Sequence, residues 1–262
     1  DFMHFLITND DGITAPGIQT LAQVAVKLGH QVTVCAPIKQ MSATGHRLTL
    51  MDPLVVGDYP IPGARAYSVD GTPVDCVRIG RAIAEQPIDF CLSGINDGHN
   101  AGTALYYSGT AAAAREATML YIPAIAISIM RGADEAMRRN LAQVAIAVAE
   151  YLRDHPMPRL TFLNINAPAL PPEHIKPLRL ASISESFYLD KYEMRTNPRG
   201  VNYFWMKDGE QTEPPLPCTD QKLMEEGHIT CTFVGTFTQH NDQYLQLPHD
   251  LRLEHNEPEK KP

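Results

Sequence analysis

The order of apolar runs and turn residues at the start of the chain is the feature that most restricts its fold. Residues 5–8 have the character of a buried strand, Pro16 suits the first position of a helix, and Gly29 suits a helix end. Residues 31–36 (QVTVCA) form a second apolar run, which Pro37 ends. A strand, a helix and a strand in that length form a βαβ unit, whose strands are parallel and whose crossover is right-handed. The sequence therefore predicts a parallel sheet covered by helices.

The same alternation continues to about residue 166. Apolar periodicity predicts further helices at residues 74–84, 108–119 and 134–152, and further strands at residues 88–92, 124–128 and 160–165. We interpret residues 1–166 as an α/β core that carries the site.

After Pro168 the prolines cluster and the regular alternation stops. Residues 187–205 contain aromatic, hairpin-like segments around an Asn-Pro-Arg-Gly turn at residues 197–200. We interpret residues 167–262 as a β-rich C-terminal extension. Edge strands in such an extension often pair with another subunit, so it is a predicted oligomerisation element.

Composition and charge narrow the class of protein. The chain has 262 residues, of which 44% are hydrophobic and 20% are charged, so it can bury a globular core. Its net charge of -8 argues against long-range attraction of nucleic acid. The five cysteines include no CxxC pair, and no apolar run is long enough to span a bilayer. We therefore expect a cytoplasmic protein that binds neither membranes nor nucleic acid.

The sequence Asn-Asp-Asp-Gly at residues 9–12 places two adjacent carboxylates at the carboxyl end of the first strand. Neighbouring side chains on a strand point to opposite faces, so Asp10 and Asp11 converge only where the chain turns, and Gly12 supplies a turn. Two carboxylates at that edge suit a hard divalent cation. An Asx turn with solvated acids fits this tetrapeptide equally well.

Two further predicted strand ends carry polar clusters on the same face of the sheet. Residues 42–46 read Ser-Ala-Thr-Gly-His, and residues 93–102 include two asparagines and an aspartate. Carboxylates mixed with hydroxyl and amide oxygens suit Mg²⁺, Mn²⁺ or Ca²⁺, whereas no histidine or cysteine has the spacing of zinc ligands. His46 is as consistent with a turn cap as with a contact to substrate.

A predicted anion site opens the alanine-rich helix, at Ser108, Gly109 and Thr110. Small residues at a helix N-terminus leave N–H groups free, and the helix dipole favours negative charge there. An ordinary N-cap explains the same residues when they are taken alone. Beside a carboxylate-bound metal, phosphate becomes the better interpretation.

Other nucleotide and phosphoryl sites fit the sequence poorly. No G-x-G-x-x-G follows the first strand, which argues against a dinucleotide fold. Residues 12–17 have the glycine spacing of a P-loop, but Ile and Gln stand at residues 18–19 in place of Lys and Ser or Thr. A response-regulator receiver would need an acceptor aspartate near residues 93–96 and a later lysine, and neither is found.

Five motifs together resemble the SurE family of metal-dependent nucleoside monophosphate phosphatases. They occur in the family's order and spacing, and the resemblance covers roughly residues 3–235. The motifs are residues 8–12, residues 36–37 with 42–46, residues 71–77, residues 93–96 with Asn100 and Gly102, and residues 107–110.

The resemblance implies a Rossmann-like three-layer αβα sandwich whose C-terminal extension is exchanged within a homodimer or homotetramer. It implies one divalent cation per subunit, Mg²⁺ or Mn²⁺ with Ca²⁺ as a substitute in crystals, and hydrolysis of 5′- and often 3′-nucleotides, sometimes with short polyphosphate. The residues that match the family's metal ligands are Asp10, Asp11, Ser42 and Asn96.

The chain departs from the family at three places. Thr103 and Ala104 stand where one or two acids are usual, which puts a role in proton transfer or site organisation in doubt. Asp97 stands where a non-acidic residue is common, and residues 232–233 are Thr-Phe in place of Thr-Pro.

We expect Asp10 and Asp11 to be catalytic, either by orienting a water or by direct attack of a carboxylate. A non-catalytic sensor of nucleotide or metal is the rival hypothesis, because the two usual acids are missing. The residues expected to hold phosphate or substrate are Asn9, Gly45, Asn100, Ser108, Gly109 and Thr110.

Overall fold

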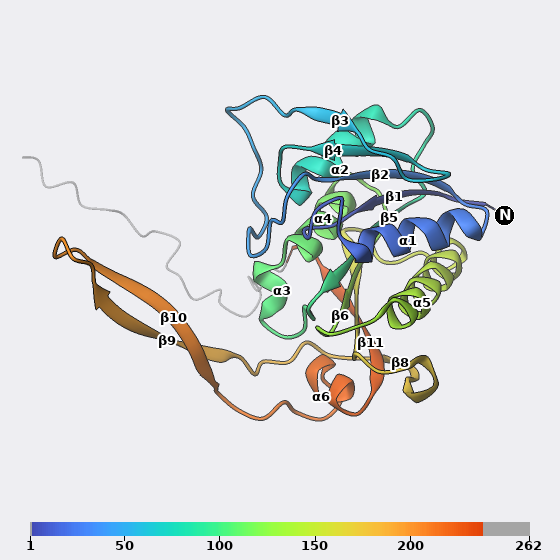
Figure 1. Ribbon diagram of the computed structural model, residues 1–262. Coiled ribbons are helices and arrows are strands. Elements are labelled where there is room, and N and C mark those ends of the chain that lie inside the picture. The colour runs from blue at the N-terminus through green and yellow to red at the C-terminus, as the bar shows by residue number, and fades with distance from the viewer. Residues whose placement is uncertain (1, 238–262) are drawn as a thin grey trace, which may run out of the picture.

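A nine-stranded sheet forms the centre of the computed structural model, which describes residues 2–237 (Figure 1). Its order is β3-β4-β2-β1-β5-β6-β7-β11-β8. The strands are β1 (His4–Thr8), β2 (Gln31–Pro37), β3 (Val56–Asp58), β4 (Arg65–Val69), β5 (Phe90–Asp97), β6 (Ala124–Ile129), β7 (Thr161–Ala167), β8 (Lys176–Leu180) and β11 (His228–Gly235).

Helices cover both faces of this sheet, which confirms the predicted three-layer α/β sandwich (Figure 1). One layer contains α1 (Pro16–Lys27) and α5 (Glu135–Asp154), which pack against each other. The other contains α2 (Pro73–Ile83) and α4 (Gly109–Met119), preceded by the short α3 (Ala104–Tyr107). The remaining elements are η1 (Pro172–His174), β9 (Tyr188–Thr196), β10 (Asn202–Gln211) and α6 (Asp220–Glu225).

The parallel strands follow the Rossmann order. From β4 to β7 all neighbours are parallel, and numbered along the chain these strands lie in the order 3-2-1-4-5-6. The order reverses between β1 and β5, which pair from Phe5 with Phe90 to Thr8 with Ser93. Ligands in such sheets bind beyond the carboxyl ends of the strands at this reversal.

Burial on both faces explains why the central strands are continuous apolar runs. Every residue of β1 and of β6 is buried, as expected for parallel strands covered by helices on both sides. On α4, residues 111–114 are four buried alanines, and such small side chains let a helix lie close to the sheet. At the start of α2, a capping box joins the Thr72 hydroxyl to the Asp75 N–H and the Asp75 carboxylate to the Thr72 N–H.

The central sheet also contains strands that follow residue 166. β11 pairs antiparallel with β7 and parallel with β8, so both late strands belong to the central sheet. Sequence periodicity missed β8 because all five of its residues are exposed. The edge strand β3 and its neighbour β4 were also not predicted.

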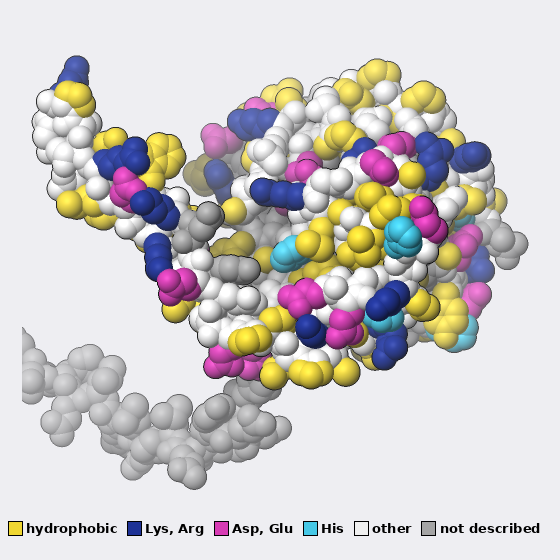
Figure 2. Space-filling model, turned by 60° about the horizontal axis from the view of Figure 1, so that its bottom comes forward, with side chains coloured by type: hydrophobic (Ala, Val, Ile, Leu, Met, Phe, Trp, Pro, Cys, Tyr) yellow, Lys and Arg dark blue, Asp and Glu magenta, His cyan; other side chains and the backbone are white. Residues whose placement is uncertain are grey.

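Among residues 2–237, the β9–β10 hairpin stands apart from the body of the molecule, as Figures 1 and 2 both show. Its strands pair with each other, and it carries exposed apolar side chains that include Tyr192, Phe204, Trp205 and Met206. The hairpin prediction for residues 187–205 is confirmed, although the second strand runs to Gln211. The part of the predicted extension after residue 237 lies outside the described residues.

All five cysteines are free thiols, and only Cys218 is exposed. Burial raises the pKa of the Cys91 thiol to about 12, so this group is inert at neutral pH. Between residues 2 and 237, no helix combines the length and the apolar character needed to cross a bilayer.

Candidate metal and phosphate site

A cavity of about 250 Å³ lies beyond the carboxyl ends of β1 and β5, at the reversal of strand order. Segments far apart in the sequence meet there: the turn after β1, the loop after β2, the end of β5 and the start of α4. The cavity is lined by Asp10, Asp11, Gln40, Ser42, Ala43, Asn96, Asp97, Gly98, His99, Asn100, Ala104, Tyr107, Ser108 and Arg131.

Asp10 is the most enclosed acid of the cavity, with 3% of its surface exposed. Its Oδ1 accepts a hydrogen bond of 2.6 Å from the Thr110 hydroxyl at the start of α4. Burial raises the pKa of Asp10 from 3.8 to about 6; the Thr110 hydrogen bond opposes this rise and the charge of Asp11 adds to it. A bound cation would offset this cost of holding a charged carboxylate in a buried place.

Asp11 is held from two sides but remains partly exposed. Its Oδ2 accepts a hydrogen bond of 3.0 Å from the Asp97 N–H, and its Oδ1 accepts one of 3.3 Å from the Gln40 side chain. The turn that aims both acids into the cavity depends on Asn9, whose amide donates to the Gly12 carbonyl at 2.8 Å. Gly12 has a φ of +96°, which side chains disfavour, so a glycine is needed there.

Neutral oxygens from two other elements complete the donor set. The Met41 N–H donates to the Asp10 carbonyl at 2.7 Å, which fixes the loop that carries Ser42 beside the acids. The Asn96 amide N–H donates to the Gly98 carbonyl at 2.6 Å, so the Asn96 Oδ1 faces away as an available acceptor.

This donor set fits a hard divalent cation. Among the described residues, no three His, Cys, Asp or Glu side chains group as a metal site. A cation in this cavity would therefore depend on the two carboxylates together with Ser42 and Asn96. Oxygen-only sites of this kind are typical of Mg²⁺ and Mn²⁺.

The start of α4 lies against the acids. Ser108 is its N-cap and accepts a hydrogen bond of 3.0 Å from the Ala111 N–H. A Cβ placed on Gly109 would lie 2.9 Å from the Asp10 Cβ, so only a glycine allows this close approach. The N-cap that the sequence offered as the ordinary alternative is thus present, and the N-cap residue Ser108 itself lines the cavity.

Several residues expected to hold phosphate also have partners within the framework of the site, and their contact with phosphate stays a prediction. Asn9, Gly45, Gly109 and Thr110 do not line the cavity. Asn9 fixes the turn and Thr110 supports Asp10, while the Gly45 N–H donates to the Tyr107 carbonyl at 3.1 Å. These hydrogen bonds form between loops that meet only in the folded protein, so no local sequence pattern predicts them.

Asn100 does line the cavity, but most of its polar groups are occupied. Its side-chain amide donates to the Ser128 hydroxyl at 2.9 Å, its N–H donates to Asn166, and its carbonyl accepts from Asn164. Asn100 therefore joins the loop after β5 to the ends of β6 and β7.

A buried charge network lies behind the loop of residues 42–46. Glu116 on α4 accepts a hydrogen bond from His46 Nε2 at 2.8 Å and forms an ion pair with Arg78, whose Nε lies 2.7 Å away. Burial favours the neutral acid, but these two partners prevail and lower the pKa of Glu116. His46 thus anchors the loop through Glu116, and it does not line the cavity.

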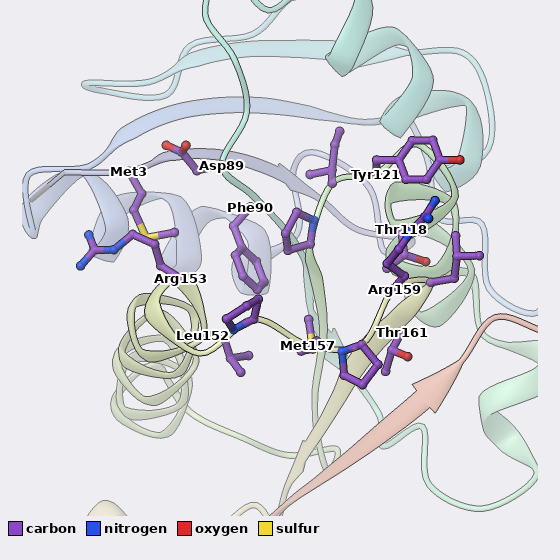
Figure 3. A pocket seen from close by; sticks show the side chains of 15 residues that line it. Met3, Asp89, Phe90, Thr118, Tyr121, Leu152, Arg153, Met157, Arg159 and Thr161 are labelled. Atoms are coloured by element: carbon purple, nitrogen blue, oxygen red, sulfur yellow. The ribbon is translucent and has the colours of Figure 1, made fainter.

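A larger cavity of about 410 Å³ lies at the opposite, amino end of the strands (Figure 3). Met3, Phe90, Pro123 and Thr161 line it, each next to the start of a parallel strand. Its lining is mainly apolar and contains no pair of carboxylates. We therefore place the chemistry in the smaller cavity at the carboxyl ends.

Sequence reasoning did not single out two polar side chains of the smaller cavity, Gln40 and Arg131. Arg131 lies two residues beyond the end of β6, at the same edge of the sheet. The rule that picked out the ends of β1 and β5 applies equally to β6 and would have found it.

The comparisons with known proteins agree with this geometry. The family described as Survival protein SurE matches residues 5–190. A protein of Carboxydothermus hydrogenoformans named 5'-nucleotidase SurE is 45% identical over 210 residues, covering 78% of this chain and 79% of that protein. One of the same name from Thermosipho africanus is 38% identical over 247 residues, covering 93% and 95%. The crystal structure of the SurE protein from Aquifex aeolicus has a TM-score of 0.80 at 32% identity, covering 92% of this chain and 97% of that one.

Fold and cavity together define an α/β protein with a cavity lined by polar oxygens at the reversal of a Rossmann-type sheet. The matches extend over most of its length. The chain belongs to the SurE family.

Proposed function

We propose that this protein is a divalent-metal-dependent phosphatase that hydrolyses nucleoside monophosphates to nucleoside and phosphate. The relatives that cover most of its length are named 5'-nucleotidase SurE. The observation that carries the proposal is the meeting of Asp10, Asp11 and the start of α4 in one cavity. Such a cavity offers carboxylates for a cation beside a helix N-terminus for phosphate.

The proposed cation is a single Mg²⁺ or Mn²⁺ held by Asp10, Asp11, Ser42 and Asn96. Such an ion neutralises phosphate oxygens and lowers the pKa of a coordinated water. The turn at Gly12 directs the two adjacent carboxylates into the cavity, where they can bind the cation together.

The protein's own groups then position and protect the reacting phosphate. In the proposed mechanism Asp10 or Asp11 orients the attacking water, or one carboxylate attacks directly to give an aspartyl-phosphate. The start of α4, where Ser108 lines the cavity, holds the remaining phosphate oxygens as negative charge develops. Thr110 keeps Asp10 in place by donating to Oδ1, which leaves Oδ2 for the cavity.

The deciding experiment measures phosphate release from a panel of 5′- and 3′-nucleoside monophosphates and p-nitrophenyl phosphate. Reactions contain Mn²⁺, Mg²⁺ or EDTA. We expect metal-dependent release that EDTA abolishes. No EDTA-sensitive release with any substrate would reject the enzyme hypothesis and favour a non-catalytic sensor of nucleotide or metal.

The same assay addresses selectivity between 5′- and 3′-nucleotides, and a tripolyphosphate arm addresses action on short polyphosphate. Rapid-quench labelling with a radioactive phosphoester separates the two mechanisms. A trapped acyl-phosphate would exclude attack by water alone, and its absence with burst-free kinetics would exclude attack by aspartate.

We further propose that the β9–β10 hairpin joins subunits into a homodimer or homotetramer, and that the protein acts in the cytoplasm. Phe204 is 62% exposed and lies opposite Met194, which is 58% exposed, and Trp205 is 60% exposed on the other face of the hairpin. Exposed apolar surface of this kind is typical of protein interfaces. Light scattering after chromatography should show an oligomer that Trp205→Ser weakens. A wild-type monomer at micromolar concentration would contradict this assignment.

A further inference from the structure

Arg131 is the one side chain of the site cavity with a fixed positive charge. It faces three carboxylates in the same lining, those of Asp10, Asp11 and Asp97. A phosphate monoester brings about two further negative charges into a space of about 250 Å³. One divalent cation would neutralise the charges of Asp10 and Asp11. Other positively charged or N–H groups are then needed to neutralise the charge of the phosphate.

The backbone fixes Arg131 beside the predicted metal ligands. The Gly98 N–H donates to the Ile129 carbonyl at 2.8 Å, which joins the loop after β5 to the end of β6. A Cβ at Gly98 would lie 3.6 Å from Arg131 Nε and 3.8 Å from Asn96 Nδ2. The guanidinium and the Asn96 amide therefore border the same small space, and a glycine at residue 98 keeps that space open.

The guanidinium is also uncommitted. Within residues 2–237 it makes no ion pair or hydrogen bond, although acids line the same cavity. Its residue is exposed, so it lies at the mouth of the cavity and not beneath it. A guanidinium presents a planar fork of N–H donors that matches two oxygens of a phosphate.

We infer that Arg131 binds the phosphate group of the substrate from the end of β6, next to Gly98. The inference rests on the proposed function and names a phosphate-binding residue for that reaction. Metal, helix N-terminus and guanidinium then contact different oxygens of one phosphate. Because such a contact is made by bound substrate and transition state alike, it lowers KM more than it changes kcat.

The test compares Arg131→Gln and Arg131→Lys with wild type in two measurements. Calorimetry gives the Kd of inorganic phosphate, with and without Mn²⁺, and steady-state assays with a nucleoside monophosphate give KM and kcat. We expect Arg131→Gln to weaken phosphate binding and raise KM by about tenfold or more, the usual effect of one lost charge-assisted contact. Arg131→Lys should recover part of the loss, since it keeps the charge without the fork.

Arg139→Gln is the matched control, because it removes one positive charge from the exposed face of α5, where Arg139 pairs with Glu135 at 2.9 Å. It should leave both measurements unchanged. Equal effects of the Arg131 and Arg139 variants, or an unchanged phosphate Kd in Arg131→Gln, would overturn the inference. The Kd of phosphate is measured without turnover, so it tests the role of Arg131 separately from the proposed activity. Failure of the proposed activity would appear as the absence of EDTA-sensitive phosphate release by wild type.

Discussion

Replacing Asp10 with asparagine should stabilise the metal-free protein at neutral pH while abolishing turnover. Asp10 is buried, and its pKa is raised to about 6, so at pH 7.5 the fold holds an ionised carboxylate where a neutral group is preferred. Asparagine has nearly the same shape, and its Oδ1 can still accept the hydrogen bond from Thr110. The substitution therefore removes a charge and little else.

The magnitude follows from proton binding to the two states. The unfolded chain releases the Asp10 proton near pH 3.8, whereas the folded protein holds it until about pH 6. The folded state binds the proton more tightly, so this contribution to stability is complete below pH 3.8 and is lost as pH rises through 6. Each pKa unit is worth about 1.4 kcal/mol, which gives a penalty of about 1 kcal/mol at pH 4.5 and about 3 kcal/mol at pH 7.5.

Urea unfolding of EDTA-treated wild type and Asp10→Asn at the two pH values measures this difference. The free energy of unfolding of the variant should exceed that of wild type by about 3 kcal/mol at pH 7.5 and by about 1 kcal/mol at pH 4.5. Asp58→Asn, on the exposed edge strand β3, is the control for loss of a surface charge and should show no such pH dependence.

Adding Mn²⁺ should act in the opposite direction. Wild type gains about 2.7 kcal/mol when the metal is at a hundred times its Kd, whereas the variant gains little. A stability difference that is constant from pH 4.5 to 7.5 would refute the claim that burial strains Asp10. Retention of full activity by the variant would refute its role as a metal ligand.

Three further substitutions test the framework of the site, each by urea unfolding of metal-free protein. Thr110→Val removes the 2.6 Å hydrogen bond to Asp10 and should cost about 1 to 3 kcal/mol at pH 7.5; an unchanged midpoint would contradict the support we assign to that hydroxyl. Glu116→Gln weakens the two ion pairs of a buried carboxylate and should cost about 1 to 3 kcal/mol at pH 7. Because folding lowers the pKa of Glu116, its carboxylate adds to the free energy of unfolding above pH 4.5, and this contribution is lost as pH falls through the folded pKa. A stability difference between wild type and Glu116→Gln that grows at acidic pH would contradict the proposed ion-pair network. Gly17→Ala places a Cβ 1.9 Å from the Ile95 carbonyl oxygen and should cost about 3 kcal/mol and lower activity, since the end of β5 must move; a neutral effect would mean that helix and strand are less closely packed.

The parts of the fold that sequence predicted are those where local pattern and burial agree. The unit β1-α1-β2 is confirmed because its strands are buried on both faces and Pro16 and Gly29 mark the helix ends. Asp10 and Ser42, predicted from separate strand ends, meet in one cavity because parallel strands bring their carboxyl ends to one edge.

The parts that escaped prediction depend on partners distant in sequence. β8 reads KPLRL and is exposed throughout, so it shows no apolar pattern and is held by its pairing with β11. Asn9 and Gly45 are predicted from their motifs to contact substrate, and the structure adds hydrogen bonds to Gly12 and Tyr107 that no motif predicts. The hydrogen-bond partner of a loop residue depends on the conformation of the folded loop, so a sequence motif alone does not predict it.

The most direct test of the account is anomalous X-ray scattering from crystals grown with Mn²⁺. We predict one strong peak per subunit in the cavity at the ends of β1 and β5, within bonding distance of oxygens from Asp10, Asp11, Ser42 and Asn96. A peak at any other place in an active crystal, or an active protein with no peak in this cavity, would contradict the central claim.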